Sequence, residues 1–197
     1  VRDGEDLGEL DALVVPGVGA AGPAMRRLER GRLVDPILSW IAAGRPYLGI
    51  CLGLQLLFDG SDEDGTETFG VLAGRTIRLE DAPTLPHIGW NQVERAREHE
   101  LFAGIPDGAD FYFVHSYATL PSPAAAPETD LVIARTTHGR PFPSAIARGP
   151  LLGVQFHPER SGPDGLRLLR NFATIAAGED PRAAPILAPR ETAAAIA

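Results

Sequence analysis

The sequence contains no lysine and only one cysteine, and it has no long apolar run. All 18 basic residues are arginine, against 26 acidic residues, so the formal net charge is -8. Such an acidic chain offers no basic face for a phosphate backbone, and we expect no nucleic-acid partner. Because no apolar run reaches the roughly 20 residues that a membrane-spanning helix needs, we also expect no membrane partner.

The single cysteine, Cys51, excludes an internal disulfide and favours a cytoplasmic location, where thiols stay reduced. A chain of 197 residues suits one globular domain with a proper core. We place that domain at residues 1–177. We expect residues 178–197, which are rich in Ala and Pro, to form a mobile tail.

The order of predicted elements favours an α/β fold. Short apolar runs at residues 11–15, 46–50 and 151–156 predict buried strands, and helical patterns follow each of them, including one at residues 52–58. This order indicates an open, mostly parallel sheet with helices on both faces. Between residues 70 and 147, short segments separated by turn residues predict a β-rich antiparallel insertion.

Cys51 stands in the pattern G-x-C-x-G, formed with Gly49 and Gly53, where a strand is expected to turn sharply into a helix. A nucleophile at the tip of such a turn needs small neighbours, because the backbone is strained and a substrate must approach it. The helix N-terminus would lower the thiol pKa and offer the N–H of Leu52 to an oxyanion. The alternative is a buried structural cysteine, and from this segment alone the two interpretations weigh about equally.

The segment "GVQFHPE" supplies a possible base. His157 lies just past a predicted strand, and Glu159, two residues on, would point to the same side of an extended backbone. His157 can accept the thiol proton, and Glu159 can hold its ring in the right tautomer. Both Cys51 and His157 follow strand ends, where sites of open α/β sheets lie. Because the cysteine elbow and the H-P-E segment occur together, a catalytic set is a stronger interpretation than an unrelated loop histidine and an exposed glutamate.

The loop "GVGAAG" at residues 17–22 matches the dinucleotide-binding pattern G-x-G-x-x-G. The next strand ends in Cys51 rather than in an acidic residue, which a ribose hydroxyl would require. We therefore interpret "PGVG" as a second oxyanion donor beside Cys51, and keep a nucleotide-dependent oxidoreductase as a weaker alternative.

No metal site is predicted. The acidic segment "DGSDEDG" lacks the terminal glutamate of a calcium loop and indicates a solvated turn. The histidines at 87, 99, 115 and 138 show no spacing typical of metal ligands, and His115 reads as the polar interruption of a core strand.

Five segments in this order, "PGVG", "LGICLGLQLLF", "PHIGWN", "YFVHSY" and "GVQFHPERSG", resemble the class I (triad) glutamine amidotransferases. The resemblance implies a flavodoxin-like α/β fold, and "PHIGWN" and "FHPERSG" are most similar to the histidine-biosynthesis branch. Members of the anthranilate or aminodeoxychorismate synthase branch, the near alternative, usually carry His at the position of Leu54 and lack "HIGWN". A catalytically silent interaction module is a further alternative.

The resemblance implies hydrolysis of glutamine to glutamate and ammonia through a thioester, with no cofactor and no metal. The residues it implies are the catalytic triad Cys51, His157 and Glu159, the oxyanion hole Val18 and Leu52, and the glutamine-binding residues Gly19, Gln55, Ser116 and Tyr117. Gln55 stands one helical turn after Cys51, so its amide can face the same pocket.

The resemblance also implies a partner, a TIM-barrel cyclase subunit that receives the ammonia in a heterodimer. Trp90 and Asn91 would lie at this interface, although a core tryptophan is the alternative. Arg160 stands where the family usually has lysine beside the catalytic glutamate, and it would belong to the same interface.

The family begins with a strand, a helix and a strand before the segment that matches "DALVVPG", whereas this sequence reaches that segment almost at once. We therefore expect a βαβ unit of roughly 30 residues to be missing from the N-terminal side of the sheet.

Overall fold

The computed structural model describes residues 7–8, 10–123 and 128–183. Its elements follow in this order along the chain: β1 (Leu13–Gly17), α1 (Ala21–Arg30), α2 (Val34–Ala42), β2 (Tyr47–Cys51), α3 (Leu52–Gln55), β3 (Gly60–Ser61), β4 (Thr66–Glu67), β5 (Gly74–Arg78), β6 (His87–Arg95), the 3₁₀ turn η2 (Glu100–Phe102), β7 (Ala109–His115), β8 (Tyr117–Pro121), α4 (Glu128–Leu131), β9 (Val132–His138), β10 (Arg140–Arg148), β11 (Leu151–Val154), η3 (Pro158–Arg160), α5 (Gly162–Ala176) and η4 (Pro181–Ala183).

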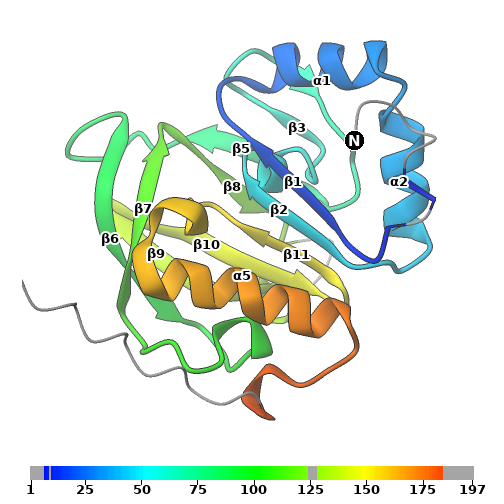
Figure 1. Ribbon diagram of the computed structural model, residues 1–197. Helices are drawn as coiled ribbons and strands as arrows, with labels where there is room; N and C mark the ends of the chain where they lie inside the picture. The colour runs from blue at the N-terminus through cyan, green and yellow to red at the C-terminus, as the bar shows by residue number, and fades with distance from the viewer. Residues whose placement is uncertain (1–6, 9, 124–127, 184–197) are drawn as a thin grey trace, which may run out of the picture.

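A seven-stranded sheet in the order β1-β2-β11-β10-β9-β6-β7 runs through the fold (Figure 1). β1, β2 and β11 are parallel neighbours, whereas the pairs from β11 to β7 are antiparallel. The α/β class is confirmed, but the sheet is mixed, because the antiparallel strands continue the parallel ones. Tight turns such as the one at Gly139, with φ of 81°, can join only antiparallel neighbours.

A second sheet, in the order β4-β3-β5-β8, lies beside the first. Its strand β8 packs against β10 of the larger sheet. The antiparallel strands expected between residues 70 and 147 are confirmed, and they join both sheets. This segment contributes β5 and β8 to the small sheet and four strands to the large one.

Helices cover both faces of the large sheet, as the alternation of side chains along its parallel strands requires. In β2, Tyr47 and Leu48 are both fully buried but belong to different apolar cores. The core beneath α5 contains Leu48, Ile50, Leu152, Val154, Leu168 and Phe172, and the core beneath α1 and α2 contains Leu13, Met25, Ile37, Trp40, Tyr47 and Leu151.

The helix expected over residues 52–58 ends at Gln55. The N–H groups of Leu57 and Phe58 donate to carbonyls three residues back, at 3.1 and 3.2 Å, so the last turn tightens. Both side chains are fully buried, and their packing sets the direction in which the chain leaves toward β3.

The C-terminal part of the described chain packs back on the domain. After α5, the turn η4 buries Pro181, and Arg182 contacts Glu100 at 3.1 Å. The tail expected over residues 178–197 lies mostly outside the described residues, which end at residue 183. Among the described helices, none is long and apolar enough to cross a membrane.

The backbones of β1, β2 and α3 touch one another directly at two glycines. A Cβ atom on Gly53 would lie 1.7 Å from the carbonyl oxygen of Val15 in β1, and one on Gly49 would lie 2.5 Å from the carbonyl oxygen of Gly53. Real Cβ atoms do not approach an oxygen so closely, so α3 can follow β2 in this way only with glycine at both positions.

We expect Gly53→Ala to lower the free energy of unfolding by about 3 kcal/mol or more, because the new methyl group must push β1 and α3 apart. Urea denaturation followed by circular dichroism measures the change. Gly8→Ala is the matched control, since a Cβ there meets nothing within 4 Å, and it should change the free energy by less than about 0.5 kcal/mol. Equal unfolding curves for the two variants would contradict the close approach.

Candidate functional site

Cys51 occupies a strained elbow between β2 and α3. Its φ is 52° and its ψ is -108°, a conformation that residues other than glycine seldom adopt. The two glycines that flank it make this strained turn possible, and the sulfur lies at the carboxyl end of a buried strand. The geometry is that of a nucleophile presented on a turn.

The thiol of Cys51 is buried and hydrogen-bonded. Gln155 donates its side-chain Nε2–H to the sulfur at 3.5 Å, and the backbone N–H of Leu52 also bonds to it. Burial nevertheless raises the pKa of Cys51 to about 12, and these two donors oppose the rise only in part. The N–H of Leu52 at the start of α3 does lower the pKa of Cys51, as the sequence predicted, but the loss of solvation outweighs it and the net shift is upward.

His157 and Glu159 form a pair at the carboxyl end of β11, the strand parallel to β2. Nδ1 of His157 lies 2.7 Å from Oε1 of Glu159, so this ring nitrogen carries a proton and donates it to the carboxylate. Nε2 of His157 is buried and has no hydrogen-bond partner among the described residues. The arrangement leaves Nε2 as the nitrogen that can accept a proton.

A pocket of about 200 Å³ opens beside Cys51. It is lined by Gly19, Cys51, Gln55, Glu63, Pro86, Val114, His115, Ser116 and Tyr117. The structure thus brings together four residues that the resemblance implies for glutamine binding, namely Gly19, Gln55, Ser116 and Tyr117. Their contact with glutamine stays a prediction.

The amide of Gln55 faces the pocket with a defined orientation. Its Nε2 group donates to the carbonyl oxygen of Tyr117 at 3.0 Å and to Oε1 of Gln155 at 3.1 Å, which uses both of its N–H bonds. Its own Oε1 atom is therefore the group left to accept a hydrogen bond from a ligand.

Gln155 is a site residue that the sequence reasoning missed. It is fully buried, and its amide links Gln55 to the sulfur of Cys51. A signal was available, because a polar side chain at the end of an apolar strand and two residues before His157 has to find polar partners inside the fold.

The loop after β1 ends beside the elbow, as an oxyanion donor requires. Gly17 pairs with Cys51 in the parallel register, so Val18 follows the end of β1 beside the elbow. Gly19 has a φ of 88° and its turn brings the loop over the pocket. The side chain of Val18 is exposed, which leaves only its backbone for a role at the site. The oxyanion hole formed by Val18 and Leu52 remains a prediction.

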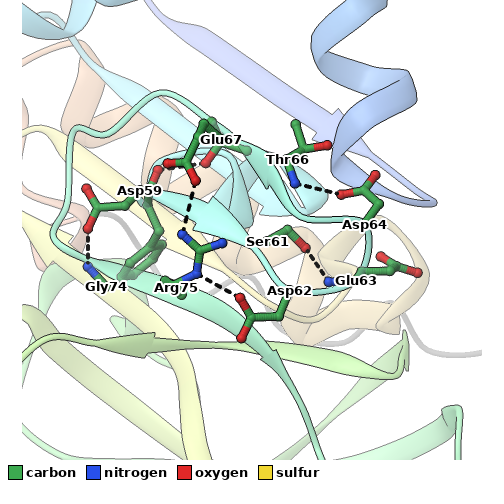
Figure 2. Close-up of polar contacts among 11 residues, drawn as sticks. Asp59, Ser61, Asp62, Glu63, Asp64, Thr66, Glu67, Gly74 and Arg75 are labelled. Carbon is green, nitrogen blue, oxygen red and sulfur yellow. Dashed lines mark hydrogen bonds and ion pairs between the residues drawn. The ribbon is translucent and has the colours of Figure 1, made fainter.

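The acidic segment at residues 59–67 folds as the hairpin β3–β4, and several of its carboxylates bind within the protein (Figure 2). Asp62 and Glu67 contact the guanidinium of Arg75 at 2.7 and 3.3 Å. Glu63 reaches the pocket, and burial, with the nearby charge of Asp64, raises the pKa of its carboxyl group. Residues 62–65 form an exposed turn, which confirms the solvated turn predicted from the sequence, but that prediction did not place Glu63 at the pocket.

The side chain of Asp64, from the turn between β3 and β4, lies at the N-terminus of α1. Its Oδ2 accepts the N–H of Gly22 at 2.7 Å; although desolvation opposes the change, this bond and those from Thr66 lower the pKa of Asp64. In the dinucleotide-binding pattern a phosphate would need this same helix end. The carboxylate of the protein itself fills that position, which argues against a nucleotide at residues 17–22.

Of the three residues proposed for a partner interface, Trp90 and Arg160 lie together around Tyr112, and Asn91 lies apart from them. Trp90 is 56% exposed, so it is not a core residue, and its ring meets the edge of Tyr112. The guanidinium carbon of Arg160 lies 4.0 Å from the centre of the same Tyr112 ring. Asn91 is half-buried and points to the opposite face of β6, where it donates to the carbonyl of Thr137 at 2.9 Å. Asn91 therefore does not share the exposed face of Trp90.

No group of three or more His, Cys, Asp or Glu side chains within residues 7–8, 10–123 and 128–183 is arranged to hold a metal ion.

Comparison with known proteins gives matches over most of the chain. The family model described as glutamine amidotransferase class-I matches residues 4–176. Imidazole glycerol phosphate synthase subunit HisH of Symbiobacterium thermophilum is 50% identical over 166 residues, which cover 84% of this chain and 76% of that protein. The subunit of the same name from Thermococcus kodakarensis is 48% identical over 173 residues, with 84% and 83% covered.

Among solved structures, a crystal structure of a glutamine amidotransferase aligns with a TM-score of 0.67 and 22% identity, over 90% of this chain and 85% of that one. At this level of identity the likeness shows the fold alone.

We expect alkylation of Cys51 by iodoacetamide to rise about tenfold per pH unit from pH 7 to pH 10 without a plateau, because only the thiolate reacts and its pKa is about 12. The rate is measured by mass spectrometry on the ligand-free protein. A small-molecule thiol, whose rate levels off above its pKa of about 8.5, serves as the control. A plateau for Cys51 below pH 9 would contradict the dominance of burial.

Proposed function

The chain belongs to the class-I glutamine amidotransferase family, and we propose that it is the glutaminase subunit of an imidazole glycerol phosphate synthase. It hydrolyses glutamine to glutamate and ammonia and passes the ammonia to a cyclase subunit in histidine biosynthesis. The high identity to subunits named HisH supports this branch of the family.

The observation that carries the proposal is the arrangement of Cys51, His157 and Glu159 at the carboxyl ends of neighbouring parallel strands. Cys51 presents its sulfur on a strained elbow, and the bond from Nδ1 of His157 to Glu159 fixes the tautomer whose Nε2 is free. A neutral thiol and a free imidazole nitrogen are the starting states that general-base activation of a cysteine needs.

The reaction proceeds in two halves. The sulfur of Cys51 attacks the side-chain carbonyl carbon of glutamine while the thiol proton passes to Nε2 of His157. The tetrahedral intermediate then breaks its C–N bond, His157 protonates the leaving nitrogen, and ammonia departs from the γ-glutamyl thioester. In the second half, His157 takes a proton from water, the resulting hydroxide attacks the thioester, and the proton returns to the sulfur as glutamate leaves.

Two backbone N–H groups stabilise the negative charge that develops on the carbonyl oxygen. The N–H of Leu52 stands at the sulfur in the free protein, and the N–H of Val18 follows the strand end that pairs with Cys51. Donors fixed by the backbone need no reorganisation during the reaction, which is why such pairs contribute strongly to catalysis.

The pocket fits both ends of glutamine. Oε1 of Gln55 accepts a hydrogen bond from the substrate, and the backbone at Gly19, Ser116 and Tyr117 holds its amino-acid end. Glu63 is the acidic side chain of the pocket, and we assign it to the positively charged α-amino group.

The partner is a TIM-barrel cyclase subunit, with which the chain forms a heterodimer. Ammonia that escapes into water becomes protonated and loses its nucleophilicity, so direct transfer is an advantage. We place the contact at the exposed cluster of Trp90, Tyr112 and Arg160, which packs around the loop that carries His157. Aromatic and arginine side chains of this kind are typical of interface centres.

The enzyme acts while Cys51 is reduced, because a disulfide or an oxidised sulfur cannot attack an amide. We therefore place it in the cytoplasm, where thiols stay reduced.

Glutaminase assays on the isolated chain and on its complex with a cyclase subunit test the function. We expect wild type to release ammonia from glutamine and Cys51→Ser to release none. We further expect Glu63→Gln to raise KM for glutamine about tenfold or more, since it removes the charge that faces the α-amino group. Glu67→Gln, on the same hairpin but paired with Arg75 outside the pocket, should leave KM within twofold. Equal KM values for the two variants would contradict the assignment of Glu63.

The interface has a separate test. We expect Trp90→Ala to weaken binding of the cyclase subunit at least tenfold in a titration of ammonia production, because a central aromatic side chain is lost. Leu120→Ala removes an apolar side chain that is 46% exposed on β8 and should leave the affinity unchanged. An unchanged affinity of Trp90→Ala would place the interface elsewhere.

A further inference from the structure

A group of imidazole rings lies behind the pocket and takes no part in the mechanism above. His87 is buried and stacks on His138 at 4.0 Å and on Phe113 at 4.7 Å between ring centres. Nδ1 of His87 lies 3.1 Å from Nε2 of His115, whose ring lines the pocket. The two strands that carry them, β6 and β7, pair these residues directly in register.

The proton positions in this group follow from one fixed acceptor. Nδ1 of His115 lies 2.9 Å from the carbonyl oxygen of Tyr117, and a carbonyl oxygen can only accept, so this nitrogen carries a proton. A neutral His115 then has a bare Nε2, and the contact with His87 requires that Nδ1 of His87 donates.

The same reasoning extends the chain to β6. A neutral His87 that donates from Nδ1 has a bare Nε2, and Nδ2 of Asn91 lies 3.2 Å from it and donates. Both rings are neutral near pH 7, because burial lowers the pKa of His87 to about 4 and that of His115 to about 3. Hydrogen bonds therefore run in one direction from Asn91 through His87 and His115 to Tyr117.

The carbonyl of Tyr117 is the point where this chain meets the site. It accepts from His115 and also from Nε2 of Gln55, whose other N–H bond goes to Gln155. Gln155 in turn donates to the sulfur of Cys51. A displacement of this one carbonyl would therefore change the orientation of the Gln55 amide and, through it, the surroundings of the nucleophile.

We propose that Asn91, His87 and His115 are positioning residues for the glutaminase reaction: their one-directional hydrogen-bond chain fixes the Tyr117 carbonyl and thereby the glutamine-facing amide of Gln55. The kinetic consequence of this inference rests on the proposed function, whereas the hydrogen-bond chain itself does not. The hydrogen-bond chain begins on β6, the strand whose opposite face carries Trp90. A shift of β6 on contact with a partner can therefore be passed through these hydrogen bonds to the pocket wall.

Packing and polarity make opposite demands on a substitution of His87. His87→Phe keeps a flat ring in the stack with Phe113 and His138 but removes both hydrogen bonds. His87→Asn loses the ring but places an amide N–H near the position of Nδ1, where it can still donate to His115. A role in packing alone favours the phenylalanine variant, whereas the hydrogen-bond chain favours the asparagine variant.

The first test is the tautomeric state, measured by nitrogen NMR on histidine-labelled full-length chain at pH 7, with signals assigned through the two His87 variants and His115→Asn. We expect both His87 and His115 to be protonated at Nδ1 and bare at Nε2. A proton on Nε2 of either ring overturns the chain, whether or not the protein hydrolyses glutamine.

The second test is kinetic. We expect His87→Phe to raise KM for glutamine about fivefold, the effect of losing roughly one net hydrogen bond, with a smaller change in kcat. We expect His87→Asn to stay within twofold of wild type. Gln92→Ala, on the outer face of the same strand and outside this chain, is the control with unchanged KM.

The outcomes separate the two claims. A wild-type protein without glutaminase activity overturns the proposed function. The NMR result still shows whether the hydrogen-bond chain has the stated direction. If wild type is active and His87→Phe has the same KM for glutamine as wild type, the positioning role is overturned and the proposed function stands. The same holds if His87→Asn raises this KM more than His87→Phe does.

Discussion

The direct contact of backbone with backbone at the elbow is the constraint on which the site depends. Cys51 keeps a φ of 52° because the glycines on either side let α3 lie against β1 and β2 without a side chain between them. In this strained conformation Cys51 lines the pocket, and its sulfur lies beside Gln155, just past the end of β11. The parallel register then brings the loops after β1 and β11, and with them the proposed oxyanion donor and the proposed base, to the same edge.

Burial around the elbow has a second effect, which bears on the chemistry. The pocket keeps the thiol neutral, since desolvation outweighs the donors at the sulfur. In the proposed mechanism, Cys51 therefore becomes a nucleophile only when His157 takes its proton. The buried amides of Gln55 and Gln155 are hydrogen-bonded to each other, so their donors are paired inside the fold.

The local sequence patterns foresaw the elbow, the His157–Glu159 pair and the α/β class, because each depends on residues close together in the chain. Gln155 and the hydrogen bonds of the histidines were not predicted because the contacts on which they depend, His87 with His115 and Gln155 with Cys51, join residues 28 and 104 positions apart. Glu63 was missed because the sequence of an exposed turn does not show that the turn lies beside a pocket. The placement of Asn91 could have been foreseen, since neighbouring residues of a strand point to opposite faces.

The central claim is that Cys51 attacks glutamine in the pocket beside it. Peptide mapping by mass spectrometry after treatment with a glutamine-analogue electrophile tests it most directly. The account predicts one covalent adduct per chain, on Cys51, whose formation is slowed by excess glutamine. An adduct on another residue, or a rate on Cys51 that glutamine does not change, would contradict it.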